Sequence, residues 1–137
     1  MEPKLKCILL VDDDEPTNFL NTTVINQMNC SETVVSMDSG LKALAYLTTK
    51  VEDQYPQPDL MFLDVNMPAM DGWQFLEAYE KLTEAQRSRL VVVMLNTSIN
   101  PDDEEKAKSN PLVDGFENKP LTGEELKDII RKYFPDL

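Results

Sequence analysis

Short apolar runs alternate along this chain with longer segments in which apolar residues recur at helical spacing. The continuous runs cover residues 7–11, 60–63 and 90–95, and a shorter mixed run covers residues 33–37. Apolar runs without alternating polar positions are typical of strands that are buried on both faces of a parallel sheet. Because residues 90–95 (LVVVML) are the most apolar of these runs, we expect them to form a central strand.

Helical segments follow these runs. Asp14 is expected at the N-cap of the first helix, with Pro16 in its first turn. Ser39 is predicted to cap the second helix, and Thr122 with Glu125 resembles a capping box before the last one. The periodicity of the first helix predicts a buried face that carries Phe19, Leu20, Val24, Ile25 and Met28.

A fifth strand is predicted at residues 115–118, and its polar character suits only the edge of a sheet. The alternation of strands and helices favours an α/β fold with a parallel sheet, helices on both faces and right-handed crossovers. The 137 residues fit one domain of this kind. Ligand sites in such sheets lie beyond the carboxyl ends of the strands.

The composition of the chain excludes several classes of partner and of catalysis. The chain has 25 acidic and 13 basic residues and a formal net charge of −12, which argues against nucleic acid or an anionic membrane as a partner. It contains no histidine, which excludes catalysis by a histidine base and metal binding by imidazole. No signal peptide is recognisable, and no segment approaches the ~20 apolar residues of a membrane span. We therefore expect a cytoplasmic protein.

The polar residues that follow the predicted strands are expected to meet at one edge of the parallel sheet. Two carboxylates ~4 Å apart repel by roughly 4 kcal/mol at an effective dielectric near 20, so three together are unstable unless a proton or a cation intervenes. Oxygen donors alone favour Mg²⁺, and a carboxylate in such a site can form an aspartyl phosphate. The residues are Asp12 and Asp13 after the first strand, Asp64 after the third, Asn96, Thr97 and Ser98 after the fourth, and Lys119 after the fifth.

Four motifs together resemble the receiver domain of bacterial two-component response regulators. They are ILLVDDD at 8–14, PDLMFLDVNMPAMDG at 58–72, VVVMLNTSINPDD at 91–103 and NKPL at 118–121. Their order and spacing agree with the family over about residues 4–134. The resemblance implies a doubly wound, flavodoxin-like fold, with a five-stranded parallel sheet of order 2-1-3-4-5 and five helices. It also implies that residues 1–137 form a single receiver domain without an output domain.

The same resemblance implies roles for individual residues. Asp64 would be the phosphoacceptor, and Lys119 would contact the phosphoryl group. Asp12, Asp13 and Asp64, with the backbone carbonyl of Asn66, would hold Mg²⁺. Lys119 and Pro120 would form the family's cis junction, and Phe116 occupies the aromatic switch position.

The resemblance further implies a phosphohistidine donor on a sensor histidine kinase or a histidine phosphotransfer protein. The domain would not be an enzyme beyond catalysing its own phosphorylation and dephosphorylation. Its output would be contact with another protein, whose identity the sequence does not reveal. In this family the contact surface is typically the fourth helix, fifth strand and fifth helix, which also allows a homodimer.

One position departs from the family, which usually has Thr or Ser at the end of the fourth strand where this chain has Asn96. The Asn96 amide can itself donate a hydrogen bond, or Thr97 can substitute after a small backbone shift. The departure leaves open a pseudo-receiver that binds partners without phosphorylation. A third alternative is a phosphatase with an aspartyl nucleophile of the haloacid-dehalogenase kind. That pattern needs Thr or Val where Pro16 stands, and Thr17 comes one residue too late.

Overall fold

The computed structural model of the chain describes residues 4–83, 85–87, 90–97 and 100–137. In these ranges five parallel strands form one sheet with the order β2-β1-β3-β4-β5. The strands are β1 (Leu5–Val11), β2 (Ser31–Met37), β3 (Leu60–Asp64), β4 (Val91–Asn96) and β5 (Gly115–Asn118). The helices are α1 (Glu15–Met28), α2 (Gly40–Leu47), α3 (Gly72–Glu80), α4 (Pro101–Ser109) and α5 (Gly123–Tyr133). The doubly wound fold and its strand order are therefore as predicted.

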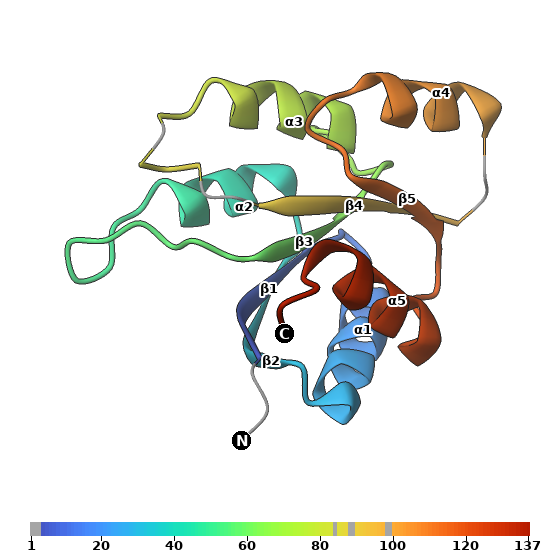
Figure 1. Cartoon of the computed structure of the whole chain (residues 1–137). Coiled ribbons are helices and arrows are strands. Elements are labelled where there is room, and N and C mark those ends of the chain that lie inside the picture. The colour runs from blue at the N-terminus through green and yellow to red at the C-terminus, as the bar shows by residue number, and fades with distance from the viewer. Residues whose placement is uncertain (1–3, 84, 88–89, 98–99) are drawn as a thin grey trace.

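The helices cover both faces of the sheet. Helices α1 and α5 lie on one face, and α2, α3 and α4 lie on the other (Figure 1). Leu9 and Met61 pack with α2 and α3, whereas Leu10 and Phe62 pack with α1 and α5. All five residues of β3 are buried, as expected for a strand between two layers of helices. β3 is the middle strand, and β4 lies next to it between β3 and β5, so the run at residues 90–95 belongs to an interior strand, as predicted.

The register of the sheet aligns the ends of its strands. Val11 pairs with Leu63, Leu63 with Met94, and Met94 with Phe116. Each of these pairs lies within a few residues of a carboxyl end of its strand, so the polar residues that follow are brought to the same edge. None of the helices in the described ranges is both long and apolar enough to cross a membrane.

The predicted buried face of α1 was right for Ile25, Val24 and Met28, which lie in or against the core, but wrong for Phe19 and Leu20. Phe19 and Leu20 are 72% and 54% exposed, while Asn18, Asn21 and Ile25 are buried. Residues 18, 21 and 25 are spaced by three and four, so they form one stripe, and Phe19 and Leu20 lie outside it. The prediction chose the face with the most apolar residues, but two of the three buried residues in this stripe are asparagines, Asn18 and Asn21. Asn18 is accommodated because its Nδ2 donates to the backbone carbonyl of Asp12 at 2.8 Å.

The helix caps agree with the sequence in part. Ser39 and Thr122 accept backbone N–H bonds at the starts of α2 and α5, as predicted. Asp14 has the extended backbone of an N-cap, but its carboxylate accepts from the Thr17 hydroxyl rather than from a backbone N–H. Only the Thr122 half of the capping box forms: Glu125 N–H donates to Thr122 Oγ1, and Glu125 Oε2 is buried without a hydrogen-bond partner.

Candidate functional site

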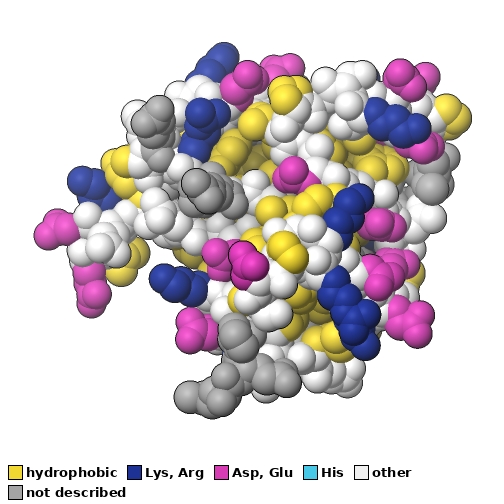
Figure 2. Space-filling view, in the orientation of Figure 1, with side chains coloured by type: hydrophobic (Ala, Val, Ile, Leu, Met, Phe, Trp, Pro, Cys, Tyr) yellow, Lys and Arg dark blue, Asp and Glu magenta, His cyan; other side chains and the backbone are white. Residues whose placement is uncertain are grey.

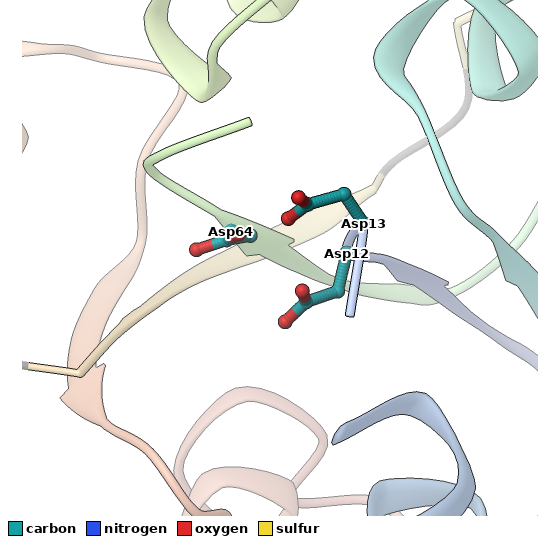
Figure 3. Close-up of side chains that lie close together, drawn as sticks. All are labelled: Asp12, Asp13 and Asp64. Carbon is teal, nitrogen blue, oxygen red and sulfur yellow. The ribbon is translucent and has the colours of Figure 1, made fainter. Parts of the chain in front are cut away.

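Three carboxylates meet at the carboxyl edge of the sheet. Asp12 and Asp13 directly follow β1, and Asp64 is the last residue of β3. Their side chains leave neighbouring strand ends and extend to the same side (Figure 3), and one oxygen from each lies within 4.8 Å of the others. Asp12 and Asp64 are only 4% and 5% exposed, whereas Asp13 is exposed. The group is thus two buried acids with one acid at the mouth of the site.

Lys119 connects the two buried acids. Its Nζ lies 2.7 Å from Asp12 Oδ2 and 3.0 Å from Asp64 Oδ1. The lysine is held in place by its backbone N–H, which donates to the carbonyl of Asn96 at 2.8 Å and so continues the pairing of β5 with β4. The peptide bond between Lys119 and Pro120 is cis. One ammonium group therefore bridges two carboxylates that would otherwise repel each other.

Burial and charge set the protonation of this group. Burial raises the pKa of Asp64 to about 6, with a further rise from the nearby Asp12 charge, while the hydrogen bond from Lys119 acts in the opposite direction. Burial by itself lowers the pKa of Lys119, but its bonds to Asp12 and Asp64 outweigh this effect and raise that pKa overall. At neutral pH the site thus holds a protonated lysine and a mostly ionised Asp64.

The loop after β3 folds tightly behind Asp64. The backbone N–H of Asn66 lies 3.4 Å from Asp64 Oδ1, and the N–H of Gly72 donates to the carbonyl of Val65 at 2.9 Å. A Cβ on Gly72 would stand 2.6 Å from the carbonyl oxygen of Asp64, so this turn requires glycine. Close packing of the loop thereby ties the start of α3 to the acidic site.

Asn96, the last residue of β4, is buried beside this loop. It is 3% exposed, and its Oδ1 accepts from the Thr97 N–H at 2.9 Å and lies 3.4 Å from Asn66 Nδ2. Thr97 is exposed, and Ser98 lies outside the described residues. Of the two residues that the sequence offers here, Asn96 is therefore the buried one and Thr97 the exposed one.

Phe116 is half-buried and packs against the hydrophobic core on the face of α2 and α3. It also lines a cavity of about 450 Å³ between α4 and α5, across the β5 edge.

On the face shown in Figure 2, acidic side chains are dispersed among basic and apolar ones. On this face the acidic side chains are thus dispersed, unlike the three carboxylates at the strand ends.

Two further residues connect this site to its surroundings, and sequence reasoning assigned neither connection. Asn18 Nδ2 donates to the backbone carbonyl of Asp12. The only signal for this bond in the sequence was a polar residue, Asn18, in the helix that follows the acidic motif. Trp73 follows Gly72, and its Nε1 lies 3.3 Å from Asp103 Oδ1 in α4, with Lys106 Nζ 5.8 Å from the ring centroid. The indole thus links the start of α3 to α4.

Comparisons with known proteins agree with this geometry. Residues 8–131 match the family model of the response regulator receiver domain. The chain is 33% identical over 99 residues to response regulator Rcp1 of Synechocystis sp., covering 72% of this chain and 66% of Rcp1. It is 30% identical over 130 residues to hybrid signal transduction histidine kinase L of Dictyostelium discoideum, covering 92% of this chain and 7% of the kinase. The chain thus spans less than two thirds of each of these relatives.

A solved structure resembles the whole fold. The crystal structure of a two-component response regulator from Cytophaga hutchinsonii superposes with a TM-score of 0.87 at 31% identity. The superposition covers 97% of this chain and 99% of that one. The similarity therefore includes the strand ends that carry the acidic group.

Proposed function

Because this chain belongs to the response regulator receiver domain family, we propose that it accepts a phosphoryl group on Asp64 in a Mg²⁺-dependent reaction. The donor is a phosphohistidine on a sensor histidine kinase or a histidine phosphotransfer protein. The observation that carries this proposal is the bridge from Lys119 Nζ to Asp12 and Asp64, with Asp13 close by. The phosphorylated domain then signals by contact with a downstream protein.

The hydrogen bonds to Asp64 indicate which of its oxygens attacks. Oδ1 is held by Lys119 and faces the Asn66 N–H, whereas Oδ2 has no recorded donor among the described residues. We therefore assign the attack on phosphorus to Oδ2, with the P–N bond to the donor imidazole breaking as the new O–P bond forms. Lys119 stays protonated beside the reacting carboxylate and stabilises the negative charge on the phosphoryl oxygens.

The donor set fits a divalent cation. With Asp64 ionised, the three carboxylates and one ammonium leave two negative charges uncompensated. All the available ligands are oxygens, which suits Mg²⁺. Asp12, Asp13 and Asp64 would hold the ion together with the backbone carbonyl of Asn66, and the ion would neutralise charge on the transferred phosphoryl group.

A pseudo-receiver is the second candidate, and the burial of Asn96 at the usual hydroxyl position favours it. We expect that acetyl phosphate with Mg²⁺ retards both wild type and Asn96→Thr on a phosphate-affinity gel, to extents within about threefold of each other. Neither protein shifts when Mg²⁺ is replaced by EDTA. A shift in Asn96→Thr but not in wild type would establish the pseudo-receiver, and a shift in EDTA would contradict the role of the metal.

Mg²⁺ binding should alter the fluorescence of Trp73, which is the only tryptophan. Trp73 is the second residue of α3, directly after Gly72, which packs on the carbonyl of Asp64. We expect titration with Mg²⁺ to change its emission by about 10% or more, with saturation near millimolar concentration. Asp13→Asn is the matched variant, because Asp13 is exposed and its loss leaves the core intact. A silent wild type, or an identical titration for Asp13→Asn, would count against this site.

A further inference from the structure

A cavity of about 530 Å³ lies beside the acidic site, on the β2 side of β1. Its volume falls within the ~300–1,000 Å³ range of small ligand sites. We call it the α1–β2 cavity, since one wall is α1 and the other is the end of β2 with the start of α2. The residues used below are Glu15, Asn18, Phe19 and Thr22 of α1, with Asp38 and Lys42 opposite.

One residue in this wall has an unsatisfied hydrogen-bond acceptor. Asn18 is 7% exposed, and its Nδ2 donates to the carbonyl of Asp12, but its Oδ1 is buried without a partner. A buried acceptor without a donor costs about 1–3 kcal/mol. Because Asn18 also lines the cavity, an occupant with N–H or O–H donors can satisfy this oxygen once the amide side chain turns towards the cavity, since the oxygen has no accessible surface in the free protein.

The charges around the cavity favour a cationic occupant. Glu15 and Asp38 contribute carboxylates, and the chain entering α1 adds Asp13 and Asp14, both of which are exposed. Lys42 pairs with Asp38 at 2.9 Å, but both side chains are largely exposed, so this pair is weak and exchangeable. A guanidinium group combines positive charge with several N–H donors in a planar fork, and it can pair with a carboxylate while donating to an amide oxygen.

The surface beside the cavity indicates a protein rather than a free small molecule. Phe19 lines the cavity and is 72% exposed, and Leu20 next to it is 54% exposed. Exposed apolar side chains beside a charged recess are typical of contact surfaces between proteins. A guanidinium can also lie over the Phe19 ring. We propose that the α1–β2 cavity receives an arginine side chain of a partner protein, whose neighbouring apolar residues cover Phe19 and Leu20.

The charge requirement can be tested on the full chain by ¹H–¹⁵N NMR without Mg²⁺ and without phosphorylation. N-acetylargininamide should shift the Asn18 side-chain amide and the backbone amides of Thr22 and Lys42 in a saturable manner, with affinity in the millimolar range. N-acetylcitrullinamide has the same shape without the charge and should bind at least about tenfold more weakly. The absence of saturable shifts below about 50 mM arginine probe, or equal responses to both probes, would overturn the proposal.

Two exposed acids provide the mutational test. Glu15→Gln and Asp38→Asn should each weaken binding of the arginine probe about threefold or more. Asp53→Asn removes the same charge from the exposed loop after α2 and should leave the affinity unchanged. If all three variants behave alike, the probe is responding only to the net charge of the protein, and the cavity is not its site.

The source of the guanidinium is tested by a peptide. The acetylated, amidated tripeptide Leu-Arg-Leu should bind at least about tenfold more tightly than N-acetylargininamide, because its leucines cover exposed apolar surface. Phe19→Ser should remove most of that gain, since Phe19 is exposed and its loss leaves the core unchanged. Equal affinities for the peptide and the single amino acid would make this a site for a free cation and would overturn docking of a protein.

Discussion

Asp64→Asn should abolish Mg²⁺-dependent phosphorylation and, without Mg²⁺ at neutral pH, should raise the free energy of unfolding. An amide oxygen is not a competent nucleophile towards an acyl phosphate or a phosphohistidine, so no phosphorylated species should accumulate. The stability gain follows from the environment of Asp64. Burial and the nearby Asp12 raise the pKa of the Asp64 carboxyl from 3.8 to about 6, so the folded protein disfavours the charged form that prevails at pH 7.

The sign of the pH dependence follows from proton uptake. Between pH ~4 and ~6 the folded state holds a proton on Asp64 that the unfolded state has lost, so Asp64 lowers stability as the pH rises through this window. The full penalty is present above the folded pKa. Two pKa units correspond to about 3 kcal/mol, which is the upper limit of the gain expected for Asp64→Asn at pH 7.5. Lys119 keeps its bond to Asp12 in this variant, so it is not left unpaired.

The measurements are the phosphate-affinity gel and urea unfolding at pH 5 and 7.5. Asp136→Asn is the control, because it makes the same chemical change at an exposed position. It should be phosphorylated like wild type and change stability by less than about 0.5 kcal/mol. Phosphorylation of Asp64→Asn would show that another residue is the acceptor. A loss of stability in Asp64→Asn at pH 7.5 would show that the carboxylate is net stabilising.

Lys119→Met should have the largest effect on stability. It removes the ammonium group that bridges the Asp12 and Asp64 carboxylates, and all three side chains are at least nine-tenths buried. Removing one partner of a buried ion pair typically costs about 3–5 kcal/mol, because the other charge is left uncompensated. Phosphorylation should fall by about 100-fold or more, since no cation replaces Lys119 beside the phosphoryl oxygens.

The loss in Lys119→Met should depend on pH and on Mg²⁺. Without the lysine, the pKa of Asp64 rises further, so Asp64 is protonated at pH 5 and the deficit relative to wild type shrinks there. Mg²⁺ should also reduce the deficit by supplying positive charge. Lys127→Met, on the exposed side of α5, is the matched control and should behave like wild type. A deficit equal at pH 5 and pH 8 and insensitive to Mg²⁺ would indicate lost packing rather than lost charge.

The parts of the fold that the sequence predicted correctly depend on local signals. The run that forms β1 and the residues that cap α2 identify their elements without reference to distant parts of the chain. The prediction for Phe19 and Leu20 in α1 failed for the opposite reason. Phe19 and Leu20 supply apolar character, but the face that α1 buries is decided by what it packs against, and the carbonyl of Asp12 there accepts from Asn18.

The candidate site also has a part that the sequence predicted and a part that it could not predict. Asp12, Asp13, Asp64 and Lys119 could be assembled from the sequence, because each directly follows an expected strand and the strands of a parallel sheet end at one edge. The sequence could not decide between Asn96 and Thr97, because adjacent residues at a strand end point to opposite faces of the sheet. Only the packing of the loop after β3 shows that Asn96 is the buried one.

By itself, then, the sequence determined the elements of this protein, their alternation, and the three acids and one lysine at its strand ends. These are properties of short segments, and strand and helix periodicity records them directly. Tertiary structure alone decided that Lys119 bridges Asp12 and Asp64, that burial raises the pKa of Asp64 to about 6, and that Asn18 Oδ1 is buried without a hydrogen-bond partner. Those properties depend on distance and exclusion of water between segments far apart in the chain, which no local pattern encodes.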